Sequence, residues 1–596
     1  MRARGSESIE RCVAELRNEL RSLERTVDDL DKRLAAMESS ESSVQPDGAQ
    51  RIEFEDSASL WSWVGQSRFL PRIAIVCFVL VLALILRTLT ESGSIQLGLG
   101  VVLGMVYSAG LIAWGWVGLA RRRRGGTVFP ACGAVLMCTV VLEAHGSFQL
   151  LTAAQANSIL LGTLAVLTLL GLSYRIAAVV AFGVLPPAVS ALILGFPNPE
   201  FAYTAAVLFG ANFAALLCAH RRNLVWLSFS TFALTLFFWL FWGFKTNAAL
   251  RSQDAVPAAL ASDWFLPCLI AFATLFVAVA AVRAFAHPRS PGVFHVLAPT
   301  LNVAWAYPTA LAIVAPSMGQ ATALGITGVI VAGAHFGIAA VLWSRIRQCA
   351  AGITSFAVAG TVLLTIAVVS ATGDLVFALP IWAAVALGLG VFSAVCGNPS
   401  LRALGYVLQG LACVFAAAGS TFGVPSASPA LAITAAAALT AISAAHFRWT
   451  HAHLPPEESW LARFDPNGRH AIGLLWFAAI NAFLLLRLLA YPGIEAAGVD
   501  LENTFRCTQS VIINGASIAL MWWGLRARDK DILGTAVAVA AIGGLRVFVS
   551  DLQNSSGIPL VIAVFSFGLA AAFGSVVLGK WQAATVDSAP TDDGSP

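Results

Sequence analysis

The chain from about residue 73 to about residue 579 is a succession of apolar runs separated by short polar connections. Each run is about 17 to 25 residues long, the length that a helix needs to cross the roughly 30 Å hydrocarbon core of a bilayer. The composition agrees, because 58% of the residues are hydrophobic and only 11% are charged. The sequence therefore predicts an all-α, polytopic transmembrane protein whose main partner is the lipid bilayer.

Lysine and arginine collect at the ends of these runs, as the positive-inside rule describes. The runs predict about 18 spans by length. They lie at approximately residues 73–89, 95–119, 127–144, 155–173, 175–195, 202–219, 223–244, 263–283, 292–315, 320–344, 351–370, 375–397, 401–421, 428–446, 471–491, 504–524, 531–550 and 557–579. With the N-terminus inside, the inner connections carry 19 basic residues, including Arg121–Arg124, and the outer ones only three. One missed span would destroy that asymmetry, so we expect an even number of spans and both termini inside.

The segment before the first span carries a heptad repeat over residues 9–37, which predicts a cytoplasmic coiled coil at residues 1–40. Such a helix either self-associates or binds a partner protein. The alternative is an amphipathic helix that lies on the protein's own surface or on the membrane. The other predicted boundaries are a polar linker with an interfacial segment at 41–68, the transmembrane domain at 69–580 and a disordered cytoplasmic tail at 581–596.

Several ionisable residues fall near the predicted outer ends of the spans, where each invites a functional hypothesis. A charge at the centre of a membrane helix costs about 2.5 to 3.5 kcal/mol or more. One hypothesis is an outward polar cavity, in which arginines bind an anionic headgroup or phosphate and Glu143 accepts a proton. The other is a set of interhelical ion pairs and snorkelling ends that fix packing. The candidate outward polar cluster comprises Arg87, Glu91, Glu143, His145, Arg487, Arg506, Arg546 and Asp551.

A cavity of this kind makes a geometric prediction. At least two of Arg87, Glu143, Arg487 and Arg546 should then lie within salt-bridge reach around one cavity.

The cysteine spacing, the basic residues and the missing catalytic motifs argue against several classes of function. Most of the ten cysteines lie within apolar runs and have no CxxC or Cys/His spacing, so we expect no disulfide framework, metal site or cofactor. The basic residues mark topology and do not indicate nucleic-acid binding. A phosphate-binding glycine loop, a nucleophile elbow and an HExxH motif are all missing from the sequence, which weakens ATP-driven and protease hypotheses.

Two short segments carry a resemblance to a known family. The first span ends in Leu86-Arg87-Thr88, and the segment Gly544–Leu552 reads GLRVFVSDL before the last span. With the N-terminal coiled coil, these resemble the uncharacterised bacterial membrane proteins catalogued as domain-of-unknown-function family 2339. Arg87, Arg546 and Asp551 match its basic and acidic positions, although lysine is expected at the first two. The resemblance implies a multi-pass protein of the bacterial inner (cytoplasmic) membrane and no particular reaction.

Three functional hypotheses follow. The leading one is a transporter or envelope-associated protein that handles an anionic or amphiphilic small molecule at the outward cluster. A second is an enzyme acting on a lipid-linked substrate at the outer face, with Glu91 or Glu143 as base. The short first outer loop and the lack of a large outer domain argue against an enzyme. A third is a scaffold that recruits partners through its coiled coil, although about 18 spans are more than an anchor needs.

Overall fold

A computed structural model describes residues 79–586 of the chain. Gaps in that range fall at residues 80, 83, 91, 93–94, 122–125, 197–199, 223, 253–263, 289–290, 319–320, 347–349, 419, 424–427, 456–458 and 465–469. The predicted coiled coil at residues 9–37, the linker at 41–68 and Glu91 lie outside the described residues. Residues 581–586, which were expected to belong to the disordered tail, are part of the last helix, which extends to Val586.

All regular structure within the described ranges is helical, as the apolar runs predict. The long helices are α4 (Leu97–Ala120), α5 (Val128–Gly146), α6 (Ala153–Ser173), α7 (Ala177–Leu194), α8 (Phe201–Arg222), α9 (Val225–Arg251), α10 (Phe265–Ala286), α11 (Val293–Met318), α12 (Ala321–Arg345), α13 (Ala350–Thr372), α14 (Leu375–Cys396), α15 (Pro399–Ala418), α16 (Pro429–Ala452), α18 (His470–Ala496), α19 (Leu501–Ala527), α20 (Lys530–Arg546) and α22 (Gly557–Val586). The short elements are α17 (Trp460–Phe464), α21 (Leu552–Asn554), a 3-10 turn at Ser420–Phe422 and a π-helix at Val547–Asp551.

Sixteen helices of the described part are long and apolar enough to cross a membrane, so the chain is an integral multi-pass membrane protein. They coincide with sixteen of the predicted runs. In the first of the other two runs, 73–89, residues 73–78, 80 and 83 lie outside the described residues, and 84–90 are helical. The run 504–524 coincides with α19, which is long enough to span. Polar residues in its first turns, such as Asn503, Arg506 and Gln509, lower its hydropathy below that of the others.

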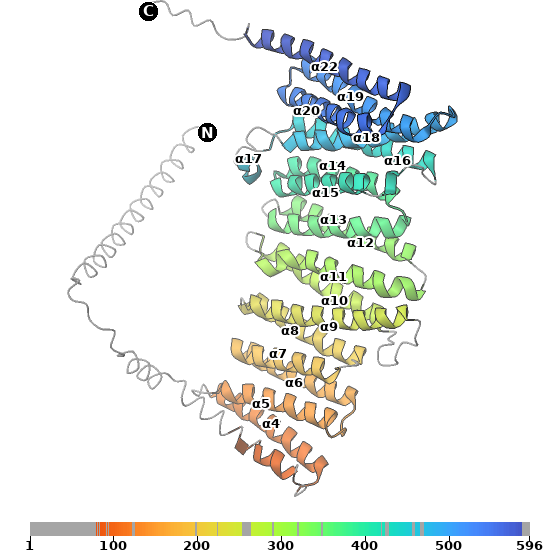
Figure 1. The fold of residues 1–596 in the computed structure, drawn as a ribbon. Coiled ribbons are helices and arrows are strands. Elements are labelled where there is room, and N and C mark those ends of the chain that lie inside the picture. The colour runs from red at the N-terminus through yellow and green to blue at the C-terminus, as the bar shows by residue number, and fades with distance from the viewer. Residues whose placement is uncertain are drawn as a thin grey trace, which may run out of the picture. The chain divides into compact units, whose positions relative to one another are not determined.

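Helices that are close in sequence pack side by side, so that they follow one another in chain order (Figure 1). Contacts join α4 to α5, α12 to α13, α14 to α15 and α19 to α20 and α22. Small residues set how closely some of these pairs approach. A Cβ atom added at Gly325 of α12 would lie 2.2 Å from the backbone nitrogen of Ala371 on α13. Close backbone approach of this kind is how membrane helices gain van der Waals contact without a hydrophobic driving force.

The contact at Gly325 predicts a strong effect of one methyl group on stability. We expect Gly325→Ala to lower the free energy of unfolding by about 1 to 3 kcal/mol, because the methyl group overpacks the α12–α13 interface. Gly333→Ala is the matched control on the same helix, since its Cβ would have no neighbour within 4 Å. Thermal unfolding of both full-length variants in one detergent measures the difference. Equal melting temperatures for the two variants would contradict the packing.

The topology prediction is tested in intact cells. An epitope inserted after Ser252, in the connection between α9 and α10, should be accessible to antibody on spheroplasts. An epitope added after Pro596 should require permeabilisation, because both termini are expected inside. The reverse pattern would overturn the predicted orientation.

Candidate functional site

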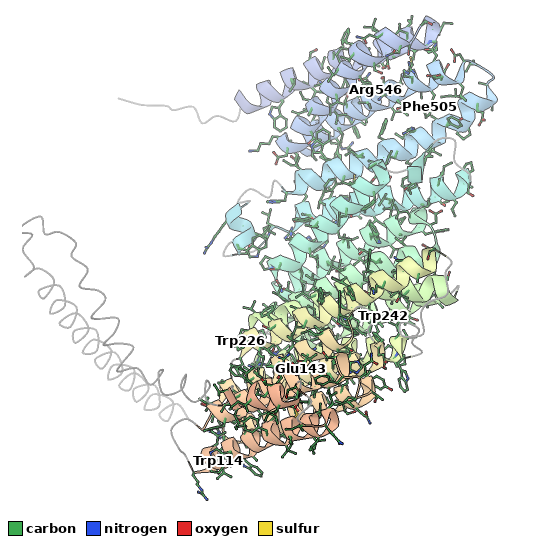
Figure 2. All side chains as sticks on the ribbon, turned by 60° about the horizontal axis from the view of Figure 1, so that its bottom comes forward. Trp114, Glu143, Trp226, Trp242, Phe505 and Arg546 are labelled. Carbon is green, nitrogen blue, oxygen red and sulfur yellow. The ribbon has the colours of Figure 1, made fainter. Side chains whose placement is uncertain are left out.

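The predicted outward residues form two groups that lie in different parts of the row of helices. Arg87 and Glu143 belong to the segment 84–90 and α5, whereas Arg487 and Arg546 belong to α18 and α20. Figure 2 shows Glu143 and Arg546 near opposite ends of the row. The four residues therefore do not surround one cavity, but two of them, Arg87 and Glu143, lie within salt-bridge reach beside one cavity, as the geometric prediction requires.

The two groups are nevertheless predicted to lie on the same side of the membrane. Twelve membrane-length helices, α6–α16 and α18, separate the end of α5 from the end of α18. An even number of crossings returns the chain to the side from which it started. The ends of α5 and α18 are therefore expected to face one compartment, which the positive-inside rule predicts to be the outside.

In the first group, the Arg87 guanidinium lies 3.0 Å from a carboxylate oxygen of Glu143. The two side chains are 52% and 32% exposed, so the pair lies at the surface of the helix row. His145 lies two residues further along α5 but bonds elsewhere, because its Nδ1 is 2.9 Å from the carbonyl oxygen of Leu151. The histidine thus fixes the turn that follows α5 and takes no part in the ion pair that joins α5 to the segment 84–90.

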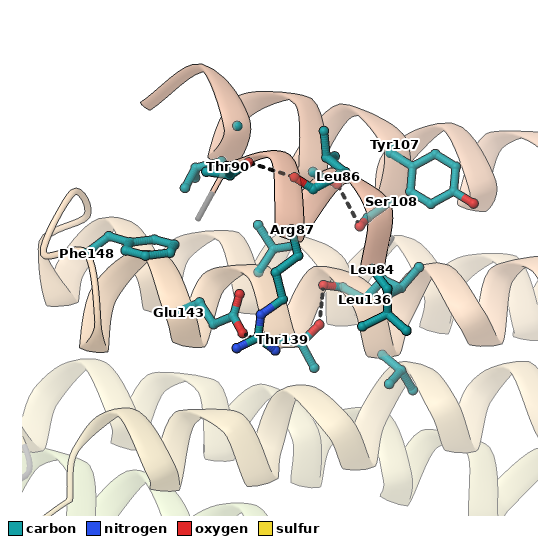
Figure 3. Close-up of a pocket in the computed structure, with 15 residues that line it drawn as sticks. Leu84, Leu86, Arg87, Thr90, Tyr107, Ser108, Leu136, Thr139, Glu143 and Phe148 are labelled. Carbon is teal, nitrogen blue, oxygen red and sulfur yellow. Dashed lines mark hydrogen bonds and ion pairs between the residues drawn. The ribbon is translucent and has the colours of Figure 1, made fainter. Parts of the chain in front are cut away.

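A cavity of about 260 Å³ extends from this ion pair between the segment 84–90, α4 and α5. Figure 3 shows the Arg87 side chain reaching from its helix toward Glu143 at one end of the cavity. The other end reaches Tyr107 and Leu136, near the midpoints of α4 and α5. The cavity is lined by Leu84, Leu86, Arg87, Thr90, Gly100, Val101, Gly104, Tyr107, Ser108, Val135, Leu136, Thr139, Val140, Glu143 and Phe148.

The walls of this cavity are apolar even where hydroxyl groups line them. Thr90, Ser108 and Thr139 each donate a hydrogen bond of 2.8 to 2.9 Å to a backbone carbonyl three or four residues earlier. Their protons are therefore turned away from a ligand. Gly100 allows the segment 84–90 to approach α4, because a Cβ atom there would lie 2.3 Å from the Thr90 hydroxyl oxygen. The cavity combines one ionic end with a long apolar wall.

The second group surrounds the start of α19. Arg506 donates to a carboxylate oxygen of Glu502 at 2.7 Å and to the backbone oxygen of Asn554 at 2.7 Å. Arg487 lies over the ring of Phe505, with 5.5 Å between the guanidinium carbon and the ring centre. Arg546 donates to the amide oxygen of Gln509 at 2.9 Å. Only Arg506 thus has an acidic partner among these three arginines, within the part of the chain that the structure describes.

Asp551 is fully buried beside this group. One carboxylate oxygen accepts a 2.5 Å hydrogen bond from Ser510, and the other has no partner. The π-helix Val547–Asp551 places it there, with the N–H of Leu552 bonded to the carbonyl of Val547. In an α-helix Arg546 and Asp551 would point about 140° apart, whereas a five-residue turn brings them toward one face. π-Helices of this kind are frequent at functional sites.

A third polar cluster was missed by the sequence analysis. Gln409 and Asn481 each donate to the Ser443 hydroxyl, at 2.9 and 3.0 Å, and His446 lies 3.3 Å from the Gln409 amide oxygen. All four side chains are buried, at the contact of α15, α16 and α18. A signal exists in the sequence, since Ser443 and His446 are three residues apart and share one helix face. His446 was overlooked because it ends a predicted span.

No known protein-family profile, curated protein or solved structure matches this chain. The resemblance carried by Arg87, Arg546 and Asp551 therefore stays a prediction. Within the described residues, no three His, Cys, Asp or Glu side chains are grouped so that they could hold a metal ion.

The Arg87–Glu143 pair predicts a measurable coupling between two helices. We expect Arg87→Glu and Glu143→Arg each to lower stability, and the double exchange to recover about 0.5 to 1 kcal/mol, because the pair is partly exposed. Thermal unfolding of the three full-length variants and the native chain in one detergent gives the coupling free energy. Strictly additive effects of the two single changes would show that the ion pair does not join the helices.

Proposed function

We propose that this membrane protein binds an amphiphilic molecule in the cavity beside Arg87 and Glu143, as a transporter or envelope-associated protein of the bacterial inner membrane. The observation that carries the proposal is the shape and lining of the cavity. It begins at an ion pair near the helix ends and continues along apolar wall to the midpoints of α4 and α5. An amphiphile has the same order of parts, a charged head followed by an apolar chain.

The size of the cavity limits the ligand. About 260 Å³ lies just below the usual range of roughly 300 to 1,000 Å³ for small-molecule pockets. A single apolar chain therefore suits the cavity better than a two-chain lipid. Exposed apolar side chains such as Leu84 and Val135, 57% and 39% exposed, lie along the wall and offer a path from the bilayer.

The ion pair defines the chemistry of the head. Arg87 offers donors for a phosphate or carboxylate, and Glu143 offers an acceptor for an ammonium group. A zwitterionic head matches both residues together, with each of its charges facing the opposite charge of the protein. A purely anionic head has to displace Glu143 from the guanidinium. We therefore favour an amphiphile with a phosphate and an amine.

The enzyme hypothesis gains no support from this geometry. Glu143 was a candidate base, but its carboxylate is already engaged by the Arg87 guanidinium at 3.0 Å. Its position at the rim also leaves the apolar interior of the cavity without a carboxylate. The arrangement suits binding or passage of a molecule more than chemistry on it.

Binding of a single-chain phospholipid tests the proposal. We expect a fluorescent lysophosphatidylethanolamine to bind the purified full chain saturably, and Val140→Phe to weaken binding about tenfold or more, because the ring fills space needed by the chain. Fluorescence anisotropy below the micelle-forming concentration of the lipid gives the dissociation constants. Val189→Phe is the matched control, since Val189 is 40% exposed on α7 and does not line the cavity.

The role of the ion pair is tested with the same probe. Arg87→Gln should weaken binding, while Arg506→Gln should not, because Arg506 bonds to Glu502 and Asn554 outside the cavity. Native affinity in Val140→Phe, or equal loss in the two arginine variants, would overturn the proposed site.

A further inference from the structure

Arg487 and Arg546 present an unusual pair of like charges on neighbouring helices. Both reach the same face of α19, because Arg487 lies over the ring of Phe505 and Arg546 donates to Gln509, one turn further along that helix. Neither forms an ion pair among the described residues, because Arg487 meets only the Phe505 ring and Arg546 only the neutral amide of Gln509. The buried Nε atom of each guanidinium has no hydrogen-bond partner.

The acid that lies closest in the chain does not neutralise this pair. Asp551 is fully buried and its carboxylate is bonded by Ser510, without a salt bridge to either arginine. Arg506, the third arginine of the group, is already matched by Glu502. Among the described residues, two cations within membrane-length helices are thus left with donors and no anion. Charged groups in such positions are costly unless they are paired.

We propose that Arg487 and Arg546 bind a phosphate-type oxyanion between α18 and α20. The planar guanidinium presents parallel donors that match the oxygens of a phosphate or carboxylate, and two guanidiniums favour the group with more charge and more oxygens. Gln509 adds a neutral donor, because its amide oxygen accepts from Arg546 and leaves the NH₂ group available. Phe505 supports the Arg487 guanidinium by a cation–π contact.

This site does not depend on the amphiphile cavity, because α18, α19 and α20 contribute none of the residues that line it. The anion chemistry has two sources, free phosphate in water or the headgroup of an anionic lipid. Both can reach the same position, because the Arg487 and Arg546 side chains are only partly buried.

The repulsion between the two arginines predicts that loss of one of them raises the melting temperature without phosphate and weakens the stabilisation by phosphate. In phosphate-free buffer at constant ionic strength, Arg487→Gln should melt at a higher temperature than the native chain, because the variant lacks the repulsion. Inorganic phosphate should raise the melting temperature of the native chain saturably, and sodium chloride at the same ionic strength should not. Arg487→Gln and Arg546→Gln should each weaken phosphate binding about tenfold or more. Arg506→Gln is the control that retains the phosphate response.

The lipid arm uses the same full-length proteins in nanodiscs that contain phosphatidylglycerol or only phosphatidylcholine. If the headgroup is the natural anion, native mass spectrometry should detect phosphatidylglycerol retained by the native chain and by Arg506→Gln, and lost from Arg487→Gln. A response to inorganic phosphate alone identifies a soluble oxyanion. The proposal is overturned if neither anion distinguishes the native chain from both the Arg487→Gln and Arg546→Gln variants.

Discussion

The hydrogen bond between backbone groups within one helix is the interaction on which this structure depends. In hydrocarbon no water is available to a free N–H or C=O group, so each span closes its own hydrogen bonds. Serine and threonine join the same scheme, as when Ser108 and Thr163 donate to carbonyls one turn earlier at 2.8 Å. Small hydroxyl residues can therefore occupy spans without a partner helix. Asparagine can donate in the same way, as Asn157 does to the Ala153 carbonyl at 2.9 Å. Arg402, Gln409 and Asp551 instead bond to groups on neighbouring helices.

The order in which the helices pack determines which residues can contribute to one site. Because each helix packs mainly on near neighbours in sequence, a site is built from two or three successive helices and the turns between them. The cavity beside Arg87 belongs to the segment 84–90, α4 and α5, and the arginine pair belongs to α18–α20. In proteins whose units contact only their neighbours, stability is close to a sum of local terms. Two sites in one row can thus bind different molecules independently.

The sequence predicts the helices better than it predicts their contacts. Apolar length alone located every long helix of the described part, including α19, whose polar first turns weaken the signal. Charge position also indicated that Arg87 and Glu143 lie at helix ends on one side, and they form an ion pair at 3.0 Å. The sequence could not show that Arg546 lies far from the Arg87–Glu143 pair. Hydropathy predicts the depth of a residue in the membrane but not its lateral position. Lateral position depends on helix packing, which distinguishes the two groups.

A comparison of the partners of individual arginines shows how Arg487 and Arg546 differ from the others. Arg402 is buried, yet its guanidinium donates to the carbonyls of Thr450 and His453 and its Nε lies 2.6 Å from the Tyr406 hydroxyl oxygen. The end of α16 stabilises that charge, because the carbonyl groups at the C-terminus of a helix carry partial negative charge. A helix end, like the carboxylate partners of Arg87 and Arg506, is a permanent feature of the fold. Arg487 and Arg546 have neither kind of partner among the described residues, which is the reason for proposing that they bind an oxyanion.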